Sequence, residues 1–114
     1  MASSSRIESI ELCLNKFSLI DKFRHLISDV DMDRGKPHPD VFLYAAKMLD
    51  IDPESCLVFE DSLAGLQAAK SAGMKCVICP DSSFENSDLE KYRDADKIVS
   101  RLSEVNLDTI KALE

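Results

Sequence analysis

The chain has 114 residues, of which 45% are hydrophobic and 31% are charged, and its formal net charge is −7 at pH 7. This length suits one domain, residues 1–114, with a single core, and the composition is that of a globular domain rather than a disordered chain. The negative charge argues against nucleic acid and anionic membrane surfaces as partners, because like charges repel.

The N-terminal stretch MASSSRIESI has neither the basic start nor the apolar middle of a secretory signal. No apolar run approaches the length of a membrane span. We therefore expect a cytoplasmic protein. Its four cysteines are scattered over predicted helices and strands, which favours reduced thiols over disulfides; they are Cys13, Cys56, Cys76 and Cys79.

The first third of the chain predicts a helix, a strand and a loop. Apolar residues recur at helical spacing over residues 6–17, and the three preceding serines are available to cap this helix; the apolar positions are Ile7, Ile10, Leu14 and Phe17. HLISDV, residues 25–30, predicts a strand. The polar stretch DMDRGKPHPD, residues 31–40, predicts a loop.

The middle of the chain predicts a helix, a strand and another helix. The first helix covers residues 40–49, with Pro39 suited to its first turn and one apolar face, formed by Phe42, Ala45, Ala46 and Leu49. The continuous apolar run at residues 56–59 is typical of a strand with both faces covered. Ser62 is expected to cap the next helix, and Gly73 to end it in a left-handed conformation.

The last third predicts a strand at 75–79, a turn at 80–83, a polar helix at 85–93 and a short strand at 97–99. A final helix carries Leu107, Ile110 and Leu113. Strands that alternate with helices predict a three-layer, Rossmann-like α/β fold with a parallel sheet.

Several polar residues follow predicted strands. Glu60 and Asp61 follow the buried strand, Lys36 lies in the loop after HLISDV, and residues 3–5 are serines that precede a helix. In open parallel sheets, ligands bind beyond the carboxyl ends of the strands. Adjacent carboxylates, an ammonium group and hydroxyls at a helix start suit a magnesium ion with a phosphate. Each group taken alone has a simpler interpretation. Glu60 and Asp61 would be a solvated loop pair, Lys36 an ordinary loop lysine, and the serines a helix cap.

The segment RGKPHPDVFLYAAKMLDIDPESCLVFEDSLAGLQAAKSAGMKCVICPD, residues 34–81, resembles the second half of a haloacid dehalogenase-like hydrolase. Within that family, the segment resembles the subgroup that includes β-phosphoglucomutase and small sugar-phosphate phosphatases. The stretch ASSSR and its following helix extend the resemblance to nearly the whole chain.

This resemblance implies roles for individual residues. The catalytic candidates are Ser3, whose hydroxyl would bind a phosphoryl oxygen, and Lys36, which would steady the nucleophile and the phosphate. Glu60 and Asp61 match the acidic motif that holds Mg²⁺. The implied substrate-binding set is Ser3, Ser4, Ser5, Arg6 and Lys36.

The sequence also departs from this family. The family's aspartate nucleophile and its acid/base aspartate lie in a D-x-D-G-T-like motif on a strand expected before ASSSR, and neither that motif nor the cap domain is among the 114 residues. Covalent phosphoryl transfer requires the nucleophile. We therefore expect the C-terminal core portion of a magnesium-dependent phosphohydrolase or phosphomutase for a small phosphorylated metabolite, such as a sugar phosphate. The alternative is a catalytically inactive fragment or a binding domain.

The missing strand has a consequence for folding. The resemblance places it between the strand that ends in ASSS and the strand that ends in FED. Without it, two strand edges would face a gap with unpaired backbone groups. We therefore expect an N-terminal half or a second copy to complete the sheet, or the strands to repack.

Three other groups of residues in the sequence could suggest a site. Asp29 and Asp31 form a D-x-D, but a solvated acidic loop is the simpler interpretation, and the segment fails as a calcium loop because Arg34 stands where glycine is required. Cys76 and Cys79 form a C-x-x-C that would suggest a redox or zinc module, yet residues three apart on a strand point to opposite faces. The two histidines, His25 and His38, lack cysteines at ligand spacing.

Overall fold

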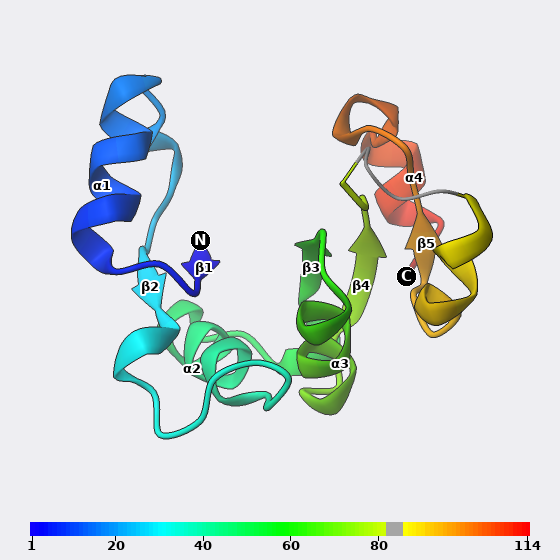
Figure 1. Ribbon diagram of the computed structural model, residues 1–114, viewed down its shortest axis with the longest axis horizontal. Helices are drawn as coiled ribbons and strands as arrows, with labels where there is room; N and C mark the ends of the chain where they lie inside the picture. Colours follow the sequence, from blue (N-terminus) through cyan, green and yellow to red (C-terminus); the bar gives the residue numbers. More distant parts are fainter. Residues whose placement is uncertain (82–85) are drawn as a thin grey trace.

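Strands and helices alternate along the chain in the computed structural model, which describes residues 1–81 and 86–114 (Figure 1). The strands are β1 (Ala2–Ser3), β2 (Ile27–Ser28), β3 (Leu57–Glu60), β4 (Lys75–Ile78) and β5 (Lys97–Ile98). The α-helices are α1 (Ile7–Lys16), α2 (Asp40–Leu49), α3 (Leu63–Ser71) and α4 (Leu107–Lys111). Short 3-10 helices are η1 (Ile20–Lys22), η2 (Asp29–Asp31), η3 (Pro53–Ser55), η4 (Asn86–Tyr92) and η5 (Leu102–Glu104).

All strand pairs in the described residues are parallel, and they form two separate sheets. β1 pairs with β2, while β3, β4 and β5 form the second sheet in that order. The predicted parallel α/β fold is confirmed. The break between the sheets lies between β1 and β3, where the resemblance places a strand that is not among the 114 residues, and the described strands have not repacked across it.

Two details of α1 differ from the prediction. Its N-cap is Arg6, which makes no side-chain capping bond, so the predicted serine cap is wrong. The buried stripe consists of Ile10 and Leu14, whereas Phe17 is 62% exposed. The helix ends at Lys16 and the chain turns away, with Ser18 at a positive φ of 55°.

The predicted strand at 25–30 is shorter in the structure. β2 covers only Ile27–Ser28, because the chain turns into η2 at Asp29. The Ser28 side chain accepts a hydrogen bond from the Val30 amide and stabilises that turn. The following helix, α2, has the predicted bounds of residues 40–49.

The β3–α3–β4 unit follows the prediction closely. The Ser62 hydroxyl caps α3 by accepting a 3.0 Å hydrogen bond from the Gly65 amide. Gly73, after the helix, has a φ of +76°, a conformation that glycine adopts without strain. One expectation is wrong: Val58 is buried, but Phe59, on the opposite face of β3, is 43% exposed, so that face is not fully covered.

The C-terminal part contains two further corrections. The predicted polar helix at 85–93 is the 3-10 helix η4, while residue 85 and part of the predicted turn, residues 82 and 83, lie outside the described residues. In α4, Asn106 and Thr109 form a capping box, but Leu107 is 73% exposed and does not belong to a buried face.

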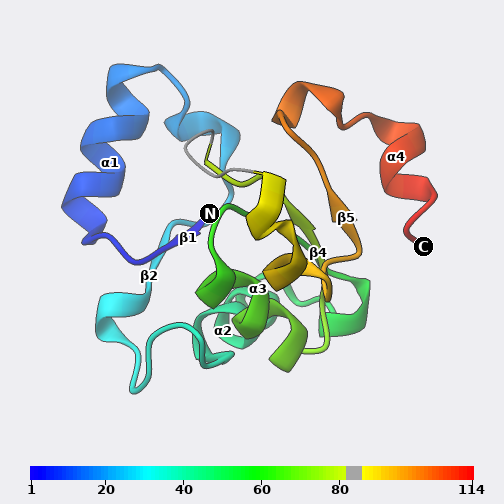
Figure 2. The ribbon, with the colours of Figure 1, turned by 45° about the vertical axis from the view of Figure 1, so that its right-hand side comes forward.

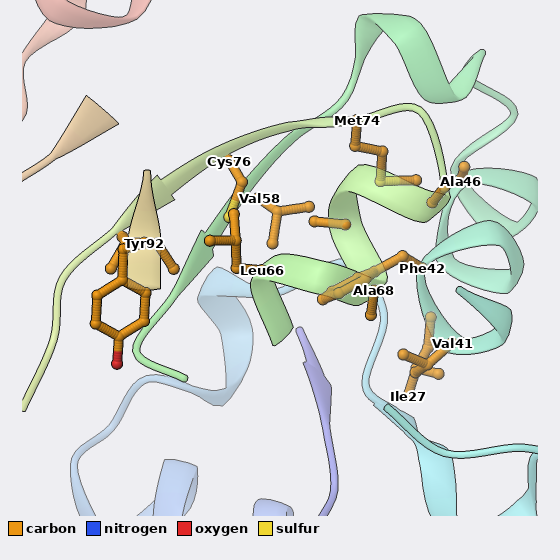
Figure 3. Packing of buried hydrophobic residues seen from close by; sticks show 13 residues of the cluster. Ile27, Val41, Phe42, Ala46, Val58, Leu66, Ala68, Met74, Cys76 and Tyr92 are labelled. Carbon is orange, nitrogen blue, oxygen red and sulfur yellow. The ribbon is translucent and has the colours of Figure 1, made fainter. Parts of the chain in front are cut away.

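The core lies between the strands and the pair α2 and α3, which contact each other. Figure 3 shows Val58, Cys76 and Leu66 side by side, with Tyr92 of η4 at one end. Leu66, Cys76 and Tyr92 are each at most 2% exposed. In Figure 2, α1 and α4 lie at opposite sides of the molecule, away from this cluster. The core therefore ties the two sheets together through α2 and α3.

Asp96, which directly precedes β5, links α3 to two strands of the second sheet. Its carboxylate accepts hydrogen bonds from the Cys76 amide at 2.7 Å and from the Lys70 ammonium at 2.8 Å. Burial alone would raise the pKa of Asp96, but these two donors outweigh it and lower the pKa below its ordinary value. This carboxylate therefore joins α3, β4 and the start of β5.

Candidate active site

A cavity of about 640 Å³ opens at the carboxyl ends of β1 and β3. Its lining includes most of the predicted site residues, namely Ser3, Ser4, Ser5, Lys36, Glu60 and Asp61. Arg6 is not in this lining; it is exposed at the start of α1. The structure thus brings three segments far apart in the sequence to one place, as expected where parallel strands end.

Lys36 and Glu60 form an ion pair in this cavity, 24 positions apart in the sequence. Their side chains are 13% and 8% exposed, so both charges are largely removed from water. The Lys36 ammonium also lies 5.2 Å from the centre of the Phe42 ring, a cation–π distance. A buried charge needs a partner, and each of these two side chains supplies it for the other.

The second oxygen of Glu60 is held by the start of α3. Oε2 of Glu60 accepts hydrogen bonds from the Ser62 hydroxyl at 3.2 Å and from the Asp61 amide at 3.3 Å. Gly65 makes this position possible, because a Cβ there would lie 2.1 Å from Cδ of Glu60. The glycine therefore leaves the space that the carboxylate occupies.

Asp61 differs from Glu60 in being exposed. Its backbone carbonyl accepts a 3.5 Å hydrogen bond from the Tyr92 hydroxyl, which connects the end of β3 to η4. The strand end thus presents one carboxylate that is held in place and one that faces solvent.

The serine loop after β1 is fixed by the residues that end β2. The Ser28 hydroxyl donates to the Ser5 carbonyl at 2.7 Å, and the Ser4 hydroxyl donates to Oδ2 of Asp29 at 2.7 Å. Oγ of Ser3 accepts from the Ser5 amide at 3.1 Å, so its own hydroxyl hydrogen can still be donated to a ligand.

Asp29 does not line the cavity, but it holds the serine loop that does, and sequence reasoning missed this role. The solvated-loop interpretation is wrong for Asp29, which is only 9% exposed, and right for the exposed Asp31. Oδ2 of Asp29 also lies 3.7 Å from where a Cβ of Gly35 would be, next to Lys36. Its place at the end of the HLISDV strand was the available signal, since strand ends in such folds face the ligand.

The donor groups suit magnesium in kind. Magnesium in proteins is bound by one or two carboxylates, with phosphate oxygens and waters completing the shell. Glu60 and Asp61 supply two carboxylates, while residues 1–81 and 86–114 contain no group of three His, Cys, Asp or Glu placed to hold a metal. Two carboxylates are as many as Mg²⁺ takes from a protein when phosphate oxygens and waters complete its shell, so Glu60 and Asp61 are the residues that could hold the ion.

The cysteines do not form a second site in the part of the chain that the structure describes. All four are free. Cys76 is buried, and burial, together with the Glu60 carboxylate, raises the pKa of its thiol to about 12. Cys79 instead lines the large cavity. A thiol that stays protonated is a poor nucleophile and a poor metal ligand, which argues against the redox or zinc module.

Among residues 1–81 and 86–114, no helix combines the length and the hydropathy needed to cross a bilayer.

Known proteins resemble this chain over most of its length. A family model described as haloacid dehalogenase-like hydrolase matches residues 1–73. β-Phosphoglucomutase of Bacillus subtilis is 44% identical over 77 residues, which cover 68% of this chain and 33% of the relative. Hexitol phosphatase B of Escherichia coli is 35% identical over 105 residues, which cover 92% of this chain and 46% of the relative.

Solved structures share the fold. A HAD family hydrolase from Deinococcus radiodurans, solved with bound phosphate and sodium, has a TM-score of 0.81 and 28% identity; the match covers 97% of this chain and 51% of that one. The chain thus spans about a third to a half of the length of these similar proteins.

Proposed function

We propose a function from one premise: the chain belongs to the haloacid dehalogenase-like hydrolase family. Residues 1–114 form the phosphate- and magnesium-binding portion of the core of a phosphohydrolase or phosphomutase. The substrate is a small phosphorylated metabolite such as a sugar phosphate. The similarity to β-phosphoglucomutase and to hexitol phosphatase B supports this substrate class.

One observation carries the proposal. The Lys36 ammonium meets the Glu60 carboxylate in the same cavity that the serine loop lines. In the proposed role, Lys36 and the Ser3 hydroxyl bind phosphoryl oxygens, because an ammonium and a hydroxyl donate hydrogen bonds to an anion. Ser4, Ser5 and the more distant Arg6 are the proposed contacts to the rest of the substrate.

Glu60 and Asp61 are the proposed magnesium ligands. When bound, the ion neutralises negative charge on a phosphoryl group. Glu60 would hold the ion with the carboxylate that now contacts Lys36, and the Lys36 ammonium would then be available to the phosphate. Asp61 already faces solvent.

On its own, the chain is proposed to bind phosphate and metal without turnover. Covalent phosphoryl transfer needs a carboxylate nucleophile, and the 114 residues contain no D-x-D-G-T motif. Asp29 is not a substitute, because it does not line the cavity that Ser3 and Lys36 line. The experiment is therefore a binding measurement, with a phosphatase assay on sugar phosphates beside it that is expected to show no activity.

Replacing Asp61 tests the magnesium site. Asp61→Asn should weaken magnesium binding by about tenfold, because an amide is a poorer ligand than a carboxylate for this ion. The matched control, Asp31→Asn, removes an exposed carboxylate that does not line the cavity and should leave the affinity unchanged. Titration calorimetry with MgCl₂ in the presence of inorganic phosphate measures both. Equal effects of the two substitutions would show that the site is elsewhere.

A cytoplasmic location is also proposed, and the four free cysteines favour it. The net charge of −7 continues to argue against nucleic acid and membranes as partners.

A further inference from the structure

Lys36 reaches the cavity of about 640 Å³ from a loop, not from a helix or a strand. In Figure 1, this loop between η2 and α2 extends toward the start of α3 before the chain turns back into α2. Ordering a lysine side chain costs conformational entropy, because it has several rotatable bonds. The surrounding residues must therefore hold both the backbone and the side chain of Lys36 if its ammonium is to keep one position.

Arg34 and Asp40 form a two-point ion pair across this loop. Nη2 of Arg34 lies 2.9 Å from Oδ1 of Asp40, and Nε lies 3.4 Å from Oδ2. Asp40 is the first residue of α2, where the helix dipole favours a carboxylate. Neither residue of the pair lines the cavity, and Lys36 lies between them in the sequence. We call residues 34–40, joined at their ends by this pair, the loop clamp.

The backbone inside the loop clamp is restricted as well. The amide of His38 donates a 3.1 Å hydrogen bond to the carbonyl of Gly35, which closes a turn around Lys36. Pro37 and Pro39 each fix one backbone dihedral angle. With its two ends joined and its centre turned, the loop has few alternative conformations. The backbone of Lys36 is thereby held relative to α2.

The first turn of α2 also contacts the lysine side chain. The Lys36 ammonium lies 5.2 Å from the centre of the Phe42 ring. Phe42 is 6% exposed, whereas the side chain of Asp40 is 21% exposed. Residues two apart on a helix do not face the same side, so Asp40 holds the loop toward solvent while Phe42 supports the ammonium from the core. One helical turn thus fixes both the backbone and the side chain of Lys36.

We propose that Arg34 and Asp40 are positioning residues, which hold the Lys36 ammonium at the cavity by closing the loop clamp. An exposed ion pair contributes little to stability, but the fork of a guanidinium fixes the orientation of a carboxylate. The pair therefore acts on the position of Lys36 more than on the free energy of unfolding. The proposal rests on the proposed function for one point, the use of Lys36 in phosphate binding. The position of the lysine side chain is measured separately.

Phosphate affinity separates positioning from simple charge attraction. Arg34→Ala makes the chain more negative, whereas Asp40→Asn makes it less negative, so an effect of charge alone would have opposite signs in the two variants. Positioning predicts that both variants bind inorganic phosphate more weakly, by about threefold. Arg34→Lys keeps the charge without the fork and should restore only part of the affinity. Titration calorimetry of the 114-residue chain in the presence of MgCl₂ measures these affinities.

NMR measures the position of Lys36 without any ligand. The ring current of Phe42 should shift the proton resonances of the Lys36 ε-methylene group, which carries the ammonium, away from those of an unstructured lysine. Arg34→Ala and Asp40→Asn should each move these resonances most of the way back. The double variant should show no further change, because the two residues act as one pair. Phe42→Leu removes the ring and identifies the origin of the shift.

Arg93→Ala is the matched control, because it removes an exposed arginine that pairs with Glu90 at 3.9 Å and does not line the cavity. It should change neither measurement. Unchanged Lys36 resonances in Arg34→Ala, or opposite changes of phosphate affinity in Arg34→Ala and Asp40→Asn, overturn the proposal. Shifted resonances with unchanged phosphate affinity would support the loop clamp and refute the use of Lys36 in phosphate binding. If the unmodified chain binds no phosphate, the proposed function is refuted, and the Lys36 resonances still decide whether the loop clamp positions the lysine.

Discussion

Both oxygens of the Glu60 carboxylate have donors, from Lys36 on one side and from the start of α3 on the other. This arrangement explains how the chain tolerates the repulsion between the adjacent carboxylates of Glu60 and Asp61. Lys36 offsets one charge within the protein, and Asp61 keeps the other in solvent. The electrostatic cost of adjacent acids is thereby reduced before any metal binds.

Gly65 should prove necessary for this geometry. Gly65→Ala puts a Cβ 2.1 Å from Cδ of Glu60 and must displace the carboxylate, so we expect magnesium affinity to fall by about tenfold. In a Glu60→Ala background the conflict is gone, and the same change should stabilise α3 by up to about 1 kcal/mol, because alanine is the better helix former. Calorimetry and urea unfolding measure the two effects. Unchanged magnesium affinity in Gly65→Ala would contradict the observed packing.

Asp29 should act as a positioning residue for the serine loop. Asp29→Ala removes the acceptor of the Ser4 hydroxyl, which should lower the free energy of unfolding by about 1 kcal/mol and weaken inorganic phosphate binding severalfold. Asp29→Asn retains an acceptor oxygen and should keep both properties near those of the unmodified chain. Asp31→Ala, at an exposed position, is the control and should change stability by less than about 0.5 kcal/mol. Phosphate affinity equal in Asp29→Ala and Asp31→Ala would exclude this role.

At the scale of elements, α2 and α3 match their predictions best. α2 has its predicted bounds, and α3 begins after Ser62 and ends before Gly73 as expected. These signals act within one turn of the chain, so the sequence contains them. β2 is shorter than predicted because a hydrogen bond from the Val30 amide to Ser28 favours a turn over a longer strand.

Asp96 should make the second sheet sensitive to acid. The pKa of Asp96 is lower in the folded chain than its ordinary value of 3.8, so its contribution to stability is present above that value and is lost as the pH falls through the folded pKa. Asp96→Asn should lower the free energy of unfolding at neutral pH by about 1 kcal/mol. The difference from the unmodified chain should vanish in strong acid.

Urea unfolding across a pH series, followed by circular dichroism, measures this effect. The neighbouring exposed residue provides the control, and Asp94→Asn should show no such pH-dependent difference. A stability loss in Asp96→Asn that persists unchanged below the pKa would mean that the charge of Asp96 does not contribute.

At the scale of the whole molecule, the core binds two otherwise separate sheets. α2 contacts β1 and β2 on one side and α3 on the other, while α3 covers β3 and β4. Helix packing thus maintains the spacing of β1 and β3 although no hydrogen bond of the described residues pairs them. A cavity of about 530 Å³, lined by residues of both sheets and of α2, accompanies this indirect connection.

Thiol reactivity should report on the integrity of that core. Cys13 is exposed and should react with a thiol reagent in the native chain, whereas Cys76 is buried, with a pKa of about 12, and should react only when the chain unfolds. The slow rate at which Cys76 reacts should increase with urea in step with the unfolded fraction. Cys76→Ala should abolish only the slow phase. Equally fast reaction of Cys13 and Cys76 in the native chain would contradict a packed core.

The sequence by itself indicated the family, through the motifs that resemble it. It also determined the parallel α/β class and the bounds of α2 and α3, because periodicity and the residues at helix ends are local properties of the chain. It also indicated which residues follow the strands, and therefore which side chains share one edge. Only the tertiary structure decided that Lys36 pairs with Glu60, that Asp29 is buried against Ser4, and that Phe59 and Leu107 are exposed. These outcomes depend on which distant segments meet, and burial and long-range pairing are set by packing rather than by neighbours in the sequence.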